Sequence, residues 1–372
     1  MSPNDYDPVT ALSRGPVIQP EYDPSDPRLG FGTNVLVQNS NLAPYVQMWN
    51  FGVEQSLWNG SVVGVSYVGS AGKKHEIGRL GYIDLNQVPF DVVREAARVQ
   101  GTLNPATQQL RPYPNFNIVQ LMMPRLGDSN YHSLQARGEQ RLRNDITLLL
   151  SYTWSKAIDN GPETFAFTGG TWPQDIYNLR LERAVSEADV AHRFVGSYVW
   201  DLPFGRGRRF QLSGVWNVLA GGWQLSGVAT LQSGRPFDIT QTTNTTRTFS
   251  LTQRPNISAT PKLSANERTL NRFFNTSAFS PANPLSVGTT PRNPVRGPGR
   301  VNFDAALIKE FPIAERRAFE FRLETFNFTN TPPFNNPVAT YDPSLPLAGQ
   351  NFGRITSAGD GRVIQFALKL RL

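Results

Sequence analysis

The chain has 372 residues, a formal net charge of +7 and no cysteine. Without cysteine it has no disulfide framework, no thiolate nucleophile and no cysteine metal site. Its lysines and arginines are scattered among turns and strands, not gathered in one stripe, which argues against nucleic-acid binding. Since no run of about 18 apolar residues occurs, no transmembrane helix is predicted.

Apolar and polar residues alternate in the first clear segment, "VQMWNFGVEQSLW" (46–58). Asn59-Gly60 follows, a strong hairpin signal because both residues tolerate a positive φ. The return segment "VVGVSYVGS" (62–70) alternates again. Side chains point to opposite faces along a strand, so each segment has one apolar and one polar face. We expect a β-hairpin here.

The same period continues to the end of the chain, and "DVVREAARV" (91–99) is expected to be one short helix in a loop. The segments have the length of strands that cross a membrane at a tilt, about 9–11 residues. Together they predict about nine strands. The further segments are 131–142, 146–156, 193–202, 223–232, 301–311, 317–328 and the terminal "RVIQFALKLRL" (362–372).

Short and long connections alternate between these strands. In an antiparallel meander alternate turns lie on the same side, so one rim carries all the short turns and the other all the long loops. Outer-membrane barrels are built in this way, with short periplasmic turns and long extracellular loops. The short connections are 58–61, 143–145, 203–221 and 312–316, and the long ones are about 71–130, 157–191, 233–300 and 330–361.

Aromatic residues are predicted to form two girdles, one at each membrane interface. Lys309 shares the apolar face of its strand, but it lies near the short-turn end, where a charge costs about 0–1 kcal/mol and the stem can snorkel. The girdle near the long loops contains Trp49, Phe51, Tyr67, Tyr152 and Trp154; the other contains Trp58, Tyr198, Trp200, Trp223, Phe311 and Phe319.

A strand count of about nine places the start of the barrel region outside the cell and its end in the periplasm, whereas complete bacterial barrels have an even count. We therefore expect the C-terminal part of a larger barrel. The opening "MSPNDYDPVTALSRG" does not have the pattern of a signal peptide, which fits this expectation. Residues 1–43 are predicted to be a lead-in that resembles an extracellular loop, and residues 44–372 the barrel part.

Several segments resemble, in consistent order, the Oar-like TonB-dependent receptors. The resemblance implies a barrel of about 22 strands with a plugged lumen. It also implies a preceding carboxypeptidase-regulatory-like domain, a segment that contacts a TonB-type energy-coupling protein, and the plug, and we expect all three to lie outside this chain. Leu372 departs from the terminal Phe common in such barrels. The segments include "APYVQMWNFGVEQSL", "LSYTWSKAIDN", "DVAHRFVGSYVWDLPFGRGRRF", "GGWQLSGVATLQSGRPFDI", "VRGPGRVNFDAALIKEFPI" and "FEFRLETFNFTNTPPFNNP".

Enzymatic chemistry has little support in the sequence. The three histidines, His75, His132 and His192, are far apart and lack ligand spacing, so no metal site is predicted. Glu320 and Glu324 could in principle do acid/base work. With Arg322 between them, however, they fit a charge-balanced lumen wall better. We expect no enzyme and no cofactor.

The loop from 159 to 189 is the first candidate for ligand contact, because it mixes carboxylates with aromatic residues and loops often carry binding function. Its candidate residues are Phe165, Trp172, Asp175 and Tyr177. The leading hypothesis is an outer-membrane receptor or transporter that captures an extracellular solute with its long loops. A structural or adhesive barrel without transport and a soluble carbohydrate-binding or hydrolytic β protein are the alternatives. The expected partners are outer-membrane lipid, the solute and the TonB-type protein, with no nucleic acid.

Overall fold

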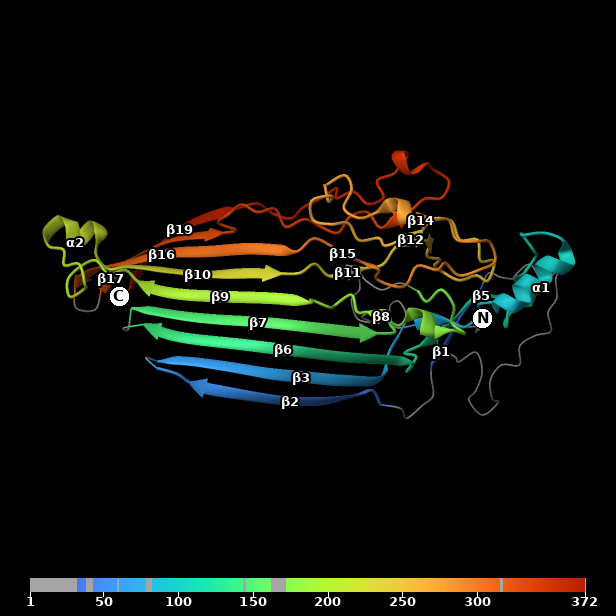
Figure 1. The fold of residues 1–372 in the computed structure, drawn as a ribbon, viewed down its shortest axis with the longest axis horizontal. Coiled ribbons are helices and arrows are strands. Elements are labelled where there is room, and N and C mark those ends of the chain that lie inside the picture. The colour runs from blue at the N-terminus through green and yellow to red at the C-terminus, as the bar shows by residue number, and fades with distance from the viewer. Residues whose placement is uncertain are drawn as a thin grey trace, which may run out of the picture.

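A computed structural model describes residues 32–37, 43–58, 60–77, 82–142, 145–161, 172–314 and 317–371. Its largest element is one antiparallel sheet in the strand order β19-β17-β16-β10-β9-β7-β6-β3-β2, with the short β8 paired to β7. The nine long strands lie side by side in chain order (Figure 1). This up-and-down order is the predicted one.

The long strands agree closely with the predicted segments, and the smaller elements lie in the connections. The long strands are β2 (Tyr45–Ser56), β3 (Ser61–His75), β6 (Gly127–Leu142), β7 (Ile146–Asp159), β9 (His192–Asp201), β10 (Trp223–Gln232), β16 (Arg300–Ala314), β17 (Arg317–Phe326) and β19 (Val363–Arg371). The short strands are β1 (Gly32–Val37), β4 (Tyr82–Asp84), β5 (Phe116–Met122), β8 (Ala184–Val185), β11 (Pro236–Phe237), β12 (Thr240–Gln241), β13 (Asn256–Ile257), β14 (Phe279–Ser280), β15 (Val295–Arg296) and β18 (Thr340–Tyr341). The helices are α1 (Phe90–Gln100) and α2 (Gly214–Ala220), with 3-10 turns η2 (Gln108–Leu110), η3 (Leu179–Glu182), η4 (Thr276–Ala278) and η5 (Leu347–Gly349).

The register keeps one face of the long strands apolar across the sheet. Opposite residues of an antiparallel pair share a face. We call this the apolar face, and its side chains are widely exposed: Phe51 is 72 % and Phe366 is 69 % exposed. An exposed apolar surface this large requires an apolar environment around it. Two of its rows are Val53, Val65, Ala136, Tyr152, Phe194, Leu231 and Val301, and Ile146, Trp200, Leu225, Leu307, Leu323 and Phe366.

Most large rings on the apolar face lie toward the strand ends, whereas the middle consists mainly of small and aliphatic residues, with Phe303 as an exception. Near the long loops the Tyr67 hydroxyl lies 2.7 Å from His132 Nδ1, and the Tyr152 hydroxyl lies 2.8 Å from His192 Nδ1. Two of the three histidines therefore have tyrosine partners. A middle row consists of Gly138, Leu150, Gly196, Ala229 and Phe303.

The opposite, polar face carries charged side chains that form ion pairs. Arg322 Nε lies 2.7 Å from Glu320, and its Nη1 lies 3.2 Å from Glu324. Arg371 Nη2 lies 3.0 Å from the other oxygen of Glu320, so the ladder continues onto β19. The two glutamates predicted to line a lumen wall are thus both paired with arginine.

The connections divide between two rims, as predicted. The short-turn rim joins β2 to β3, β6 to β7, β9 to β10 and β16 to β17. The long-loop rim carries the described residues of 76–126, 160–191, 233–299 and 327–362, which we call the loop assembly (Figure 1). No helix in the described part of the chain is both long and apolar enough to cross a membrane.

The main hydrophobic core lies in the loop assembly, not against the long strands. It is centred on Phe274, whose ring meets Phe279 and Phe352 edge-on at centroid distances of 5.8 and 5.1 Å. A second cluster packs Val93 and Ala97 of α1 against Leu285. The loops are therefore a folded unit with its own core, located at one end of the long strands (Figure 1).

Three details differ from the sequence-based expectations or extend them. The helix predicted at 91–99 is α1, which ends at Gly101 with a φ of 65°. The connection at 203–221 was expected as a turn, yet it contains α2. Lys309 was expected to snorkel toward water, but its side chain is buried under α2.

Candidate functional site

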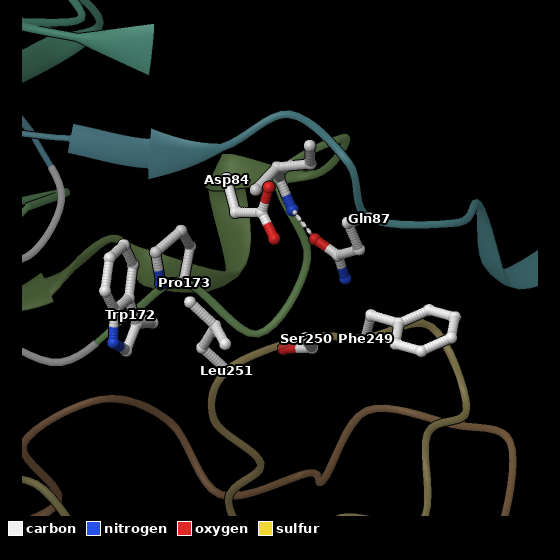
Figure 2. Close-up of a pocket in the computed structure, with 8 residues that line it drawn as sticks. Asp84, Gln87, Trp172, Pro173, Phe249, Ser250 and Leu251 are labelled. Carbon is white, nitrogen blue, oxygen red and sulfur yellow. Dashed lines mark hydrogen bonds between the residues drawn. The ribbon is translucent and has the colours of Figure 1, made fainter. Parts of the chain in front are cut away.

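The four predicted ligand-contact residues belong to the loop between β7 and β9. Phe165 lies outside the described residues. Trp172 packs edge-on against Tyr82, with ring centroids 4.7 Å apart. Figure 2 shows Trp172 beside Pro173, with Leu251 below them in the view, Asp84 at the end of β4 and Gln87 on the segment that follows β4.

These groups enclose a hollow with a volume of about 10 Å³, which holds about one water molecule. It is too small for a solute in this conformation. The hollow therefore gives no support to the contact role of Trp172, which stays a prediction. The hollow is lined by Asp84, Gln87, Trp172, Pro173, Ile176, Phe249, Ser250 and Leu251.

Asp175 bonds to Tyr177 within its own loop, and Tyr177 joins this loop to the loop of Gln87. The Tyr177 backbone N–H donates to Asp175 Oδ1 at 2.9 Å, and the Tyr177 hydroxyl donates to the Gln87 carbonyl at 2.7 Å. Burial raises the pKa of Asp175, and the neighbouring charge of Glu182 raises it further. Burial and the nearby Asp175 charge also raise the pKa of Tyr177. The Tyr177 hydroxyl thus ties the two loops together, and ligand contact by Asp175 and Tyr177 stays a prediction.

Replacing Asp175 with asparagine is expected to stabilise this loop near neutral pH. Because the folded-state pKa of Asp175 lies above its ordinary 3.8, the ionised carboxylate destabilises the loop once the pH exceeds both values. Asparagine keeps the acceptor oxygen and removes this penalty. Amide hydrogen exchange over residues 172–178 should be slower in Asp175→Asn than in the parent near neutral pH. The two proteins should converge below pH 3.8, and an equal difference at every pH would contradict this explanation.

A buried polar network connects three of the long loops. Arg254 Nη1 donates to Glu182 Oε2 at 2.7 Å, and its Nη2 donates to Glu182 Oε1 at 3.0 Å. Gln174 Oε1 accepts the backbone N–H of Arg254 at 2.7 Å. The Gln87 side chain in turn donates to the Gln174 carbonyl at 2.9 Å. Arg254 and Gln174 are fully buried.

Further charged groups surround this network. Arg292 donates to the Glu182 carbonyl at 2.8 Å and forms an ion pair with Asp159 at the end of β7. Asp238 lies 3.8 Å from Arg254, and burial raises its pKa while the Arg254 charge opposes that change. The sequence analysis missed this network because its central ion pair, Arg254–Glu182, joins residues that are 72 positions apart, and the Arg292–Glu182 contact joins residues that are 110 apart.

A larger cleft, with a volume of about 500 Å³, opens in the same assembly. This volume lies within the usual range of ligand pockets, about 300–1,000 Å³. The Arg268 guanidinium stacks over Phe273 at 5.3 Å, and Arg296 forms an ion pair with Asp189. Lys262 is exposed at its edge and has no ion pair within the described residues. The lining residues are Ser233, Gly234, Pro261, Lys262, Leu263, Arg268, Phe273, Phe274, Pro294, Val295, Arg296, Gly297 and Gly299.

The cleft was also missed by the sequence analysis. Its residues span 233–299, and no local motif marks them. The only local signal is the density of Arg, Lys and Phe in "PKLSANERTLNRFFN" (261–275). The cleft thus lies among the long loops, and these loops connect the strands of a sheet that has one apolar face.

These features define the chain as an outer-membrane β-barrel protein, with the apolar face toward lipid. The family described as "Outer membrane beta barrel domain" matches residues 2–365. The chain belongs to this family, and its location is the outer membrane.

Among solved structures the chain is similar to the outer membrane transporter YddB from Escherichia coli, with a TM-score of 0.49 and 9 % sequence identity. The match covers 91 % of this chain and 34 % of the transporter. The chain thus spans about a third of the length of that protein. No curated protein matches it.

Proposed function

We propose that the chain is the barrel part of an Oar-like TonB-dependent receptor that captures a solute with its long loops and moves it across the outer membrane. The cleft of about 500 Å³ in the loop assembly carries this proposal. The buried network around Arg254 supports it, because the network holds the loops in one ordered arrangement above the barrel. The TonB-dependent part of the proposal rests on the sequence segments that resemble the Oar-like receptors in consistent order.

The sheet is proposed to be completed by further strands. Within the described residues β2 and β19 each pair with a long strand on one side only. An open strand edge in lipid costs several kcal/mol for each unpaired backbone group. The first long strand starts at the long-loop rim and the ninth ends at the short-turn rim. An even-stranded barrel of about 22 strands accommodates this arrangement with additional strands at both edges.

The cleft favours an anionic solute. Lys262 and Arg268 supply positive charge, whereas Arg296 is paired with Asp189, and Phe273 supplies a ring for stacking. After capture, displacement of a plug that lies outside this chain would open the lumen. A TonB-type protein would supply the energy through a segment that also lies outside the chain.

Solute uptake by the producing cells tests this function. Parent cells should deplete the solute from the medium, and cells without the gene for this protein should leave it there. Cells without the gene for the TonB-type protein should show the same defect. Mass spectrometry of spent medium measures both. Lys262→Glu should lower the rate of uptake more than Lys262→Gln, because only the former reverses the charge. Arg98→Gln, on an exposed side of α1, serves as the control.

An adhesive barrel without transport is the second candidate, since the same ordered loops could hold a partner. In that case deletion of the gene would change surface attachment and leave the spent medium unchanged. The soluble alternative is wrong, because the chain belongs to an outer-membrane family.

A further inference from the structure

The helix α2 lies at the short-turn rim and is held by two side chains. Trp223 Nε1 donates to the Leu219 carbonyl at 2.8 Å. Lys309 Nζ donates to the carbonyls of Val218 and Gly221, both at 2.5 Å. Figure 1 shows α2 at the end of the sheet opposite the loop assembly.

Both anchoring side chains belong to the apolar face. Trp223 pairs with Lys309 across β10 and β16, and Lys309 pairs with Phe321 on β17. The Lys309 ammonium lies 5.2 Å from the Trp223 ring centroid and 5.0 Å from that of Phe311. Since a helix C-terminus favours a cation, Lys309 finds its partner in the last turn of α2. The helix is therefore attached on the lipid side of the rim.

The other side of α2 is fixed against the preceding turn. Asn217 Oδ1 accepts the backbone N–H of Arg206 at 2.9 Å, and the Asn217 carbonyl accepts that of Gly221 at 3.1 Å. A Cβ on Gly221 would lie 2.7 Å from the Asn217 carbonyl oxygen and 2.9 Å from Gly205 Cα, so glycine is required for this close approach. The only polar side chain of the helix is thus turned toward the protein.

The large apolar side chains of α2 point away from the protein. Val215, Trp216, Val218 and Leu219 are 70 %, 68 %, 55 % and 59 % exposed. On the same rim Ile313, at the irregular end of β16, is 56 % exposed. This patch continues the lipid-facing surface beyond the end of the strands.

We propose that α2 is an interfacial helix that inserts these four side chains into the periplasmic leaflet of the outer membrane. The occupant of the patch is phospholipid, because the patch is continuous with the surface that already faces lipid. Arg206 and Arg209 in the adjoining turn are exposed and form no ion pair with any residue that the structure describes. They provide positive charge at the level of the phosphate groups. Apolar residues beside basic ones are the pattern of helices that lie in a membrane interface.

Spin labelling in bilayers tests this placement. The chain has no cysteine, so a label on Val215→Cys is unique within it, and Gln211→Cys in the same connection is the matched control. The protein is reconstituted with phosphatidylethanolamine and phosphatidylglycerol, and the parent without the introduced cysteine reports background labelling. We expect the label at 215 to collide more with oxygen than with a water-soluble nickel complex, and the label at 211 to show the reverse.

Equal nickel accessibility at both positions would overturn the proposal. The proposal would also be overturned if the label at 215 were shielded from the nickel complex in native outer membranes but not in the pure bilayer. That result would indicate a periplasmic protein as the occupant. Lys309→Met should increase nickel accessibility at position 215 because α2 loses its anchor. Lys369→Met removes a lysine from the polar face and should leave this accessibility unchanged.

Discussion

Replacing Arg254 with methionine is expected to destabilise the loop assembly by about 3–5 kcal/mol, the usual cost of removing one partner from a buried ion pair. The substitution leaves the Glu182 carboxylate buried without its two hydrogen bonds. It also removes the donor that contacts the Leu181 and Thr290 carbonyls. Hydrogen exchange over residues 172–190 and 240–296 should accelerate, while the long strands stay protected.

Two control variants separate the buried pair from a general effect of losing charge. Arg98→Met removes an ion pair with Glu95 on the exposed surface of α1, where solvent screens the charges, and should cost far less than Arg254→Met. Arg254→Met combined with Glu182→Leu should cost less than the single Arg254→Met change, because no unpaired charge stays buried. An effect of Arg254→Met as small as that of Arg98→Met would contradict the role given to the network.

Two adjacent leucines on β7 allow the assignment of the sheet faces to be tested with the same substitution. Leu150 lies in the middle row of the apolar face, whereas Leu149 points to the polar face opposite Glu139. Their exposures are nearly equal, 38 % and 41 %, so solvent accessibility alone does not distinguish them. Leu150→Arg should lower the free energy of unfolding in a bilayer by about 2–4 kcal/mol, the cost of a lipid-facing arginine at the membrane midplane.

Leu149→Arg should change the free energy of unfolding by no more than about 1 kcal/mol, because its guanidinium would lie on the polar face, which already carries the ion pairs of Glu139 with Arg137 and Arg141. Urea unfolding of both variants in phospholipid vesicles measures the difference. If Leu149→Arg were the more damaging substitution, the two faces would have to be exchanged.

The strands could be predicted from the sequence because an outer-membrane barrel repeats one local rule, a period of two with turns between. In β10 the prediction agrees with the structure at both ends, and in β3 the strand extends five residues beyond the predicted segment, to His75. Gly72 and Lys73 lack the apolar alternation, and their pairing with β6 sets the end of the strand. Local pattern therefore predicts the middle of a strand better than its end.

The loop assembly could not be predicted in this way, because long-range contacts determine its structure. Nothing near Arg254 in sequence indicates a partner at Glu182, and the cleft between Lys262 and Arg296 forms only when the loop folds back. Lys309 is a similar case. The alternation predicted its position on the apolar face. It did not indicate its hydrogen-bond partner, the Gly221 carbonyl at the end of α2, which lies 88 residues earlier in the chain.

The side of the membrane on which each rim lies tests the account most directly. Ala265→Cys places a thiol on an exposed part of the loop assembly, and Gln211→Cys places one in the short-turn rim. A membrane-impermeant maleimide added to intact cells should label position 265 at once. It should label position 211 only after the outer membrane has been permeabilised. Labelling of position 211 in intact cells, with position 265 protected, would contradict the proposed orientation and with it the capture of an extracellular solute by the long loops.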